Sequence, residues 1–433
     1  MMKRDLAAAI PMILAAAYSF LLVPSVLSEA GAPFLGVYFV SVITAFVGAL
    51  LMGSLRIPML LAPSLVVTVF LVEIPILSHG MSWQISLLVT LAAALVAFLL
   101  SFLRRMEAVL EKLPRSLSAG LDTGIALMLI AYGGITGDLI VRDPVSVITL
   151  GDFKTPLTML SFVGILIFFA LRAAGVRAAI LISMGTVALI SFCEGFWVIP
   201  PDPFLLPEGL DRTALQFTLT EGWNALPVGD YVNLFVFLLL YLILWTRGSF
   251  AAFFPTGEGE KEKGDIARKS AKKAVRRIYL LGALAAVLGA PPLVAAPETA
   301  AGREKGAELS QRGGFLLAAL LVPFLFIEPV LYEITTFPAC LVPGLVGSGV
   351  MLLERVGNPF RMAADFPERA SVGILIFLLP VTRDIALSLG AGLMTFVFLK
   401  CMAGKRAEVE MPLIVLFLLL LAYFFYGYWS ILI

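Results

Sequence analysis

Charge and polarity are scarce in this sequence. Only 14% of its 433 residues are charged and 60% are hydrophobic, whereas soluble domains carry about 25% charged and about 45–50% apolar residues. The mean hydropathy is +0.99. These values exclude a soluble enzyme and a disordered chain. The formal net charge is only +1, so no basic field attracts DNA or RNA, and we expect no nucleic-acid partner.

Cysteine and histidine are nearly absent. The three cysteines, Cys193, Cys340 and Cys401, lie far apart and form no CxxC pair, which argues against a disulfide framework, an iron–sulfur site and a zinc site. His79 is the only histidine, so a histidine-based triad or an HExxH metalloprotease is excluded. No nucleophile–base pair or metal-ligand set appears, and we therefore expect no enzyme, no metal and no cofactor.

The sequence is rich instead in apolar runs of membrane length. They recur from 6–24, where we expect a first membrane helix rather than a cleaved signal peptide, to 411–433, and many are about 20 residues long, enough to cross a bilayer as a helix. Basic residues gather in alternate loops such as 104–115 and 253–277, whereas the long loop 198–228 holds a single arginine. Because cytoplasmic loops carry the excess of Lys and Arg, this pattern predicts fourteen crossings, with the N-terminus in the cytoplasm and the chain in the cell (inner or plasma) membrane.

Two apolar segments are short and contain a proline. They are 59–72, with Pro63, and 291–302, with Pro297. Each is the third element of a set of seven if the second set begins near 229, and since seven is odd, the two sets have opposite orientations. Discontinuous helices in inverted repeats are typical of transporters, because their unpaired N–H groups bind polar ligands near the bilayer midplane. The alternative is that each segment is re-entrant or interfacial and binds no ligand.

The predicted fold is an all-α polytopic membrane protein built as two inverted repeats of seven segments. The repeats cover 1–197 and 229–402 and are joined by an outer loop, 198–228. A charged cytoplasmic insertion is expected at 253–277, and an additional C-terminal membrane helix within 403–433.

Short motifs follow one another in a specific order through the first half. They are VPSVLSEAG at 23–31, LAP at 61–63, GMSWQ at 80–84, LPRSL at 113–117 and VITLGD at 147–152. In order and spacing they resemble the nucleobase–cation symporter-2 (xanthine/uracil permease) superfamily, and within it the hypoxanthine/guanine/adenine permease branch. The resemblance is dense over 10–200 and thin after 229.

This resemblance implies fourteen transmembrane segments in two inverted sevens, with a core domain that carries substrate past a gate domain. It places the substrate site between the short third and tenth helices and the eighth helix. It also implies coupling to protons, and it suggests a homodimer.

At the implied site the second half departs from the family pattern. The family's eighth helix has an acidic residue followed by Thr-x-Gly-Thr, where this chain has Trp245-Thr246-Arg247-Gly248-Ser249 without the acid. The family's tenth helix begins Glu-Ser and continues with glycines; here Glu298-Thr299 keeps the glutamate but not the glycine-rich continuation. In the third helix, Thr68 stands where the branch often has asparagine.

Glu298 is the leading candidate for substrate binding and proton coupling. It follows Pro297 at the start of a short helix, where a buried carboxylate can accept a hydrogen bond from a substrate N–H and carry a proton. The alternative is a carboxylate that only stabilises the helix start. Asp122, about two turns inside the fifth segment, is the second candidate proton carrier; the alternative is a local pair with Arg115.

Further candidate binding residues are polar or aromatic. Arg247 has three open interpretations: a pair with Glu298, an anion-binding group, or a side chain that extends to the interface. Trp245 can stack on a planar ring or pack against lipid. The hydroxyl groups can bind substrate or their own helix backbone; they belong to Ser64, Thr68, Thr246 and Thr299.

Other charges are assigned to the outer surface. We expect Arg383 and Asp384 to pair locally in an outer turn, and Glu73 to be solvated in an outer loop. Glu328 borders the outer end of its segment and is also expected to be solvated.

The leading hypothesis is a secondary active transporter of nucleobase-like, chiefly purine, substrates, coupled to protons or another cation, that moves its core against its gate within the lipid bilayer. One alternative is an organic or inorganic anion carrier of the same fold, with Arg247 as the anion-binding group. The other is a non-transporting binding or assembly subunit, with 253–277 as its partner surface.

Overall fold

The computed structural model describes most of the chain as helices. It describes residues 2–55, 57, 59–102, 114–143, 147–176, 178–204, 209–216, 261–295 and 313–409, with single helical residues between 231 and 242 and between 411 and 421. Within these residues, 6 helices are long and apolar enough to cross a membrane, and a pair bent by 68° is a seventh candidate span. The predicted crossing at 229–252 lies largely outside the described residues.

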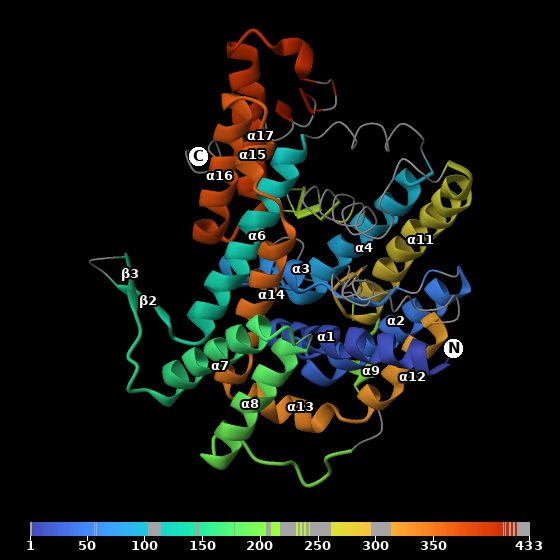
Figure 1. Ribbon diagram of the computed structural model, residues 1–433, viewed down its shortest axis with the longest axis vertical. Coiled ribbons are helices and arrows are strands. Elements are labelled where there is room, and N and C mark those ends of the chain that lie inside the picture. Colours follow the sequence, from blue (N-terminus) through green and yellow to red (C-terminus); the bar gives the residue numbers. More distant parts are fainter. Residues whose placement is uncertain are drawn as a thin grey trace.

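One group of helices surrounds a small strand pair and is called the strand-pair group below. It lies on the right and at the lower centre of Figure 1. Its members are α1 (Met2–Glu29), α2 (Phe34–Ser54), β1 (Leu61–Pro63), α3 (Leu65–Leu71), the π-helix η1 (Val72–Ser78), α4 (Trp83–Leu100), α9 (Leu210–Thr213), α11 (Lys261–Leu288), β4 (Leu293–Ala295), α12 (Gly313–Leu321), the 3-10 helix η3 (Val322–Leu325) and α13 (Glu328–Thr335).

The other group packs around α6 and is called the α6 group. In Figure 1 its members run down the left side of the molecule, and the hairpin β2–β3 projects away from them. They are α6 (Arg115–Thr136), β2 (Ile140–Asp143), β3 (Val147–Leu150), α7 (Pro156–Ala173), α8 (Ala179–Cys193), the 3-10 helix η4 (Pro338–Cys340), α14 (Val342–Arg355), α15 (Pro359–Met362), α16 (Phe366–Thr382), α17 (Ile385–Met402) and the 3-10 helix η5 (Arg406–Glu408).

Glycines allow helices within each group to approach very closely. A Cβ atom built on Gly314 would lie 2.4 Å from the Cα of Gly53, so α2 and α12 cross with their backbones in contact. In the α6 group, a Cβ on Gly124 would lie 2.5 Å from Leu379 of α16. Association of apolar helices in lipid depends on such close packing, since lipid tails are as apolar as the helices themselves.

The charged segment expected as a cytoplasmic insertion at 253–277 is described from residue 261 onward. Residues 261–277 are helical there and form the first part of α11, which continues without a break to Leu288. Its arginines hold the ends of two neighbouring helices: Arg277 donates to the carbonyl of Leu51 at 2.5 Å, and Arg276 donates to the carbonyl of Ser101 at 3.3 Å. The last carbonyls of a helix have no partner within it, and cations stabilise that end.

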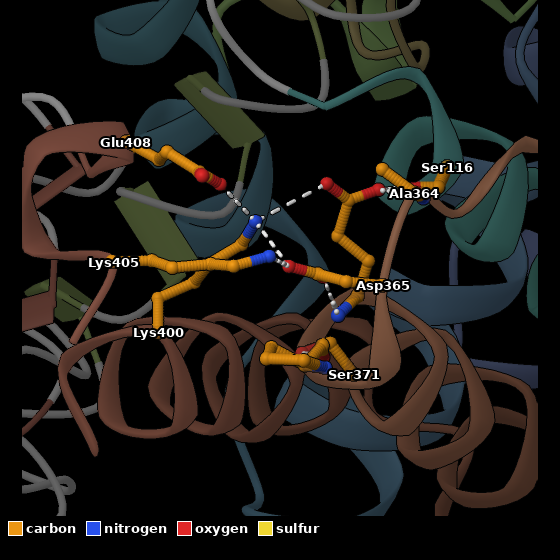
Figure 2. A network of polar contacts seen from close by, with 9 residues as sticks. Ser116, Ala364, Asp365, Ser371, Lys400, Lys405 and Glu408 are labelled. Atoms are coloured by element: carbon orange, nitrogen blue, oxygen red, sulfur yellow. Dashed lines mark hydrogen bonds and ion pairs between the residues drawn. The ribbon is translucent and has the colours of Figure 1, made fainter. Parts of the chain in front are cut away.

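A buried lysine joins three elements at one end of the α6 group. Lys400 is 2% exposed. Its Nζ lies 2.9 Å from Asp365, 2.5 Å from Glu408 and 3.6 Å from Glu368 (Figure 2). Glu368 also accepts a hydrogen bond from Ser116 at the start of α6, at 2.8 Å. The cluster therefore ties together the start of α6, the start of α16 and the end of α17.

Asp365 is the acceptor that the two lysines share. Its Oδ2 lies 2.7 Å from Lys405 Nζ as well as 2.9 Å from Lys400 Nζ. Burial opposes the charge of this carboxylate, but the hydrogen bonds from Lys405 and Lys400 outweigh burial and lower the pKa of Asp365 to about 2. The carboxylate is therefore ionised throughout the physiological pH range.

The two lysines offer a matched test of burial. Lys400→Met leaves the three carboxylates without their buried cation, and we expect a loss of about 3–5 kcal/mol in the free energy of unfolding. Lys405→Met removes a cation whose side chain is 43% exposed, and we expect a loss of about 0–1 kcal/mol. Thermal unfolding of purified protein in detergent measures both, and equal losses would contradict this account of the cluster.

The lowered pKa of Asp365 also predicts a pH dependence. A carboxylate with a depressed pKa in the folded state contributes stability above its unfolded pKa, and this contribution is lost as the pH falls through the folded value. The difference in Tm between wild type and Asp365→Asn should thus be constant above about pH 5 and shrink as the pH approaches 2. A difference that grows in acid would show that the ionised carboxylate is not the stabilising form.

Candidate functional site

The two short segments predicted at 59–72 and 291–302 come together in the structure. Strand β1 pairs antiparallel with β4, with Leu61 opposite Ala295 and Pro63 opposite Leu293. The Ser64 N–H then donates to the carbonyl of Pro292 at 3.1 Å. All six strand residues are buried, with α1 and α2 packed against β1 and α11 against β4. The pairing gives backbone partners to extended chain at a depth where water is excluded.

Helix α3 begins where β1 ends, and Ser64 caps it. The Ser64 Oγ accepts a hydrogen bond from the Val67 N–H at 3.3 Å, and the Thr68 hydroxyl donates to the Ser64 carbonyl at 2.8 Å. Ser64 is 2% exposed and Thr68 is fully buried. The structure thus brings these two candidates together one helical turn apart, and the Thr68 hydroxyl makes the backbone bond that was the alternative to substrate binding.

The second half of the candidate site lies outside the described residues. This applies to Trp245, Thr246, Arg247, Pro297, Glu298 and Thr299. The last strand residue, Ala295, is two positions before Pro297 in the sequence.

Asp122 lies on α6, in a helix long enough to span a membrane, and is partly buried. The alternative interpretation, a pair with Arg115, is not seen. Among the residues that the structure describes, none forms a hydrogen bond or an ion pair with Asp122. A carboxylate in that setting is expected to mark function.

Two expectations for outer charges are wrong. Glu73 is not a solvated loop residue, because it forms an ion pair at 2.6 Å with Arg383, more than three hundred residues away in sequence. Glu328 is 8% exposed, and its Oε1 has no hydrogen-bond partner within the described part of the chain. No local sequence signal reveals these positions, because burial and partner both come from distant helices.

Comparison with known proteins supports the resemblance seen in the first half and extends it. The chain is 25% identical to the guanine/hypoxanthine permease PbuO of Bacillus subtilis (strain 168) over 432 residues, which cover 96% of each chain. It is 21% identical to the adenine permease AdeP of Escherichia coli (strain K12), over 92% of this chain and 86% of that one. No family model matches. These relatives confirm the predicted resemblance to hypoxanthine/guanine/adenine permeases, and their names are those of transporters, not enzymes.

Solved structures share the fold. The transmembrane domain of the cyanobacterial bicarbonate transporter BicA superposes with a TM-score of 0.63 at 15% identity, over 89% of this chain and 97% of that one. SLC26A9 superposes with a TM-score of 0.55 at 11% identity, over 90% of this chain and 66% of that one. The fold is therefore that of a helical membrane-transporter domain.

The cap of α3 can be tested by two neighbouring hydroxyl groups. Ser64→Ala removes the acceptor for the Val67 N–H, and we expect a loss of about 1 kcal/mol in stability, as for other helix caps. Thr68→Val is the control, because the Ser64 carbonyl keeps its bond from the Thr68 N–H at 3.1 Å. Thermal unfolding measures both variants, and a larger loss in Thr68→Val would contradict the assigned cap.

Proposed function

We propose that this protein is a permease that carries nucleobases, purines above all, across the cell membrane by secondary active transport. The observation that carries the proposal is similarity to guanine/hypoxanthine and adenine permeases along nearly the whole chain. The fold agrees with it, because the solved structures that superpose are transporters. The strand pair β1–β4 supports a site beside it, because residues from both halves of the chain are buried together there.

The finer architecture of the proposal is fourteen crossings in two inverted repeats, with the N-terminus in the cytoplasm. The antiparallel pairing of β1 with β4 supports it, since the third elements of two oppositely oriented repeats are expected to meet head to tail. The separation into a strand-pair group and an α6 group supports transport by relative movement of a core and a gate.

In the proposed site, the first half contributes α3, which leaves the strand pair, and the second half contributes the residues that follow β4 in the sequence. Ser64 and Thr68 come from the first half, and Pro297, Glu298 and Thr299 from the second. Glu298 accepts a hydrogen bond from a purine N–H and carries the coupled proton. Trp245, Thr246 and Arg247 come from the eighth segment, and Asp122 carries a proton on the α6 side.

The second candidate is an anion carrier of the same fold. It rests on two features of the eighth segment: the acidic residue that the permease branch has before Thr-x-Gly-Thr is absent, and Arg247 lies nearby. Solved neighbours include a bicarbonate transporter and an anion transporter, but they share the fold alone. Loss of anion uptake in Arg247→Gln, with purine uptake absent in wild type, would favour this candidate.

Uptake of labelled guanine, hypoxanthine and adenine tests the proposal in cells without their own purine carriers. Wild type should accumulate at least one of them, and Glu298→Gln should reduce uptake by tenfold or more, about 1.4 kcal/mol. Asp122→Asn should abolish acceleration by an inward proton gradient. Glu194→Gln, an exposed carboxylate after α8, is the control with unchanged uptake. Well-folded wild-type protein that neither binds nor carries any purine would overturn the proposal.

A further inference from the structure

Polar contacts between described residues connect the strand-pair group to the α6 group at their outer ends. The first is the ion pair between Glu73 of η1 and Arg383, which follows α16; its atoms are 2.6 Å apart and its side chains are 16% and 17% exposed. The second is the hydrogen bond from the Tyr132 hydroxyl of α6 to Glu29, the last residue of α1, at 2.9 Å. Tyr132 is 3% exposed.

These four residues form one cluster. The charges of Glu73 and Arg383 act on the Tyr132 hydroxyl, and Glu73 also acts on Glu29. All four lie at or near the ends of their helices, at the end of the molecule that the charge pattern places outside the cell. The Lys400 cluster lies at the opposite end of α16 and α17 and stays within the α6 group.

The backbone fixes the position of Arg383. Its φ is +57°, in the left-handed region, and its N–H donates to the Leu379 carbonyl at 2.9 Å to close α16. Glycine is the usual residue at such a helix end, because a side chain there is strained. The side chain that starts from this strained position forms the ion pair with Glu73, and strained positions of this kind concentrate where function needs them.

Both contacts respond to the same movement. An ion pair shielded from water on most of its surface is strong only at close range. Since Glu29 and Glu73 move with one group and Tyr132 and Arg383 with the other, sliding of one group past the other separates both contacts together. Within each group, by contrast, helices are held by backbone-to-backbone packing that does not separate easily.

We propose that Glu73–Arg383 and Glu29–Tyr132 form an outer latch, which closes the path between the two groups on the outer side and opens once in each transport cycle. The latch rests on the proposed transport function. It predicts that removing one partner shifts the population toward conformations open to the outside, because only the closed state gains from the contact.

A reporter cysteine tests the latch without any substrate. Leu129→Cys places a thiol one turn below Tyr132 on α6, at a position that is 2% exposed, in protein whose exposed Cys193 and Cys401 are serine. A membrane-impermeant maleimide added outside should label it roughly tenfold faster in Glu73→Gln or Arg383→Gln than with the latch intact, as expected for a tenfold rise in the open population. The exchange Glu73→Arg with Arg383→Glu should restore slow labelling.

The control is a second Arg–Glu pair that lies within one group. Arg172 of α7 and Glu354 of α14 are 2.5 Å apart, both in the α6 group. Arg172→Gln and Glu354→Gln should leave the labelling rate unchanged. Unchanged labelling in the latch variants as well, with only a lower Tm, would assign Glu73–Arg383 a structural role and overturn the latch.

A reversible cross-link connects the latch to transport. The starting protein has serine at Cys193 and Cys401 and keeps Leu129. In it, a short bifunctional thiosulfonate joins the cysteines of the Glu73→Cys, Arg383→Cys double variant. Cross-linking should reduce guanine uptake at least tenfold, and reductant should restore it. Full uptake by the cross-linked protein would overturn the latch while the proposed function stands. Absence of purine uptake by the parent protein, in which Glu73 and Arg383 are intact, would count against the proposed function alone, and the labelling rates then decide the latch.

Discussion

Everything near the centre of this protein depends on one constraint: a polar backbone group inside a bilayer must find its partner within the protein. A continuous helix satisfies its own groups, but a segment as short as α3 does not reach across. The chain resolves this by placing three residues of extended backbone before α3 and pairing them with Leu293–Ala295. The strand pair then requires α1, α2 and α11 to surround it, and this sets the arrangement of the strand-pair group.

Features whose signal is local were predictable from the sequence. Proline and shortness predicted the interrupted segments at 59–72 and 291–302, and the structure joins them. Apolar length predicted the membrane helices, and the order of the motifs predicted the resemblance to purine permeases. Ser64 before an apolar run is also a local signal, and it caps α3.

Features that arise from distant contacts were not predictable. The Glu73–Arg383 pair joins residues in different halves of the chain, so the sequence indicated a solvated Glu73 and a local partner for Arg383. Burial of Lys400 depends on carboxylates from α16 and η5. The charge density after 253 likewise gave no sign that Arg276 and Arg277 would bind the ends of two neighbouring helices. Six candidate site residues lie outside the described part of the chain, and their roles stay predictions.

The strand pair also means that one strand is synthesised well before its partner. Pro63 and its partner Leu293 are 293 − 63 = 230 residues apart, which at about 5–20 residues per second amounts to roughly 10–50 seconds of translation. During that interval β1 is already made and its partner is not. The N–H and C=O groups of β1 then need other hydrogen-bond partners, from water, the insertion machinery or neighbouring helices. The close contact of α2 with Gly314 forms later still, because Gly314 follows β4 in the sequence. Until residues 293–295 are made, the N-terminal half therefore contains a strand without its partner, and a chain whose translation stops before residue 293 never gains it.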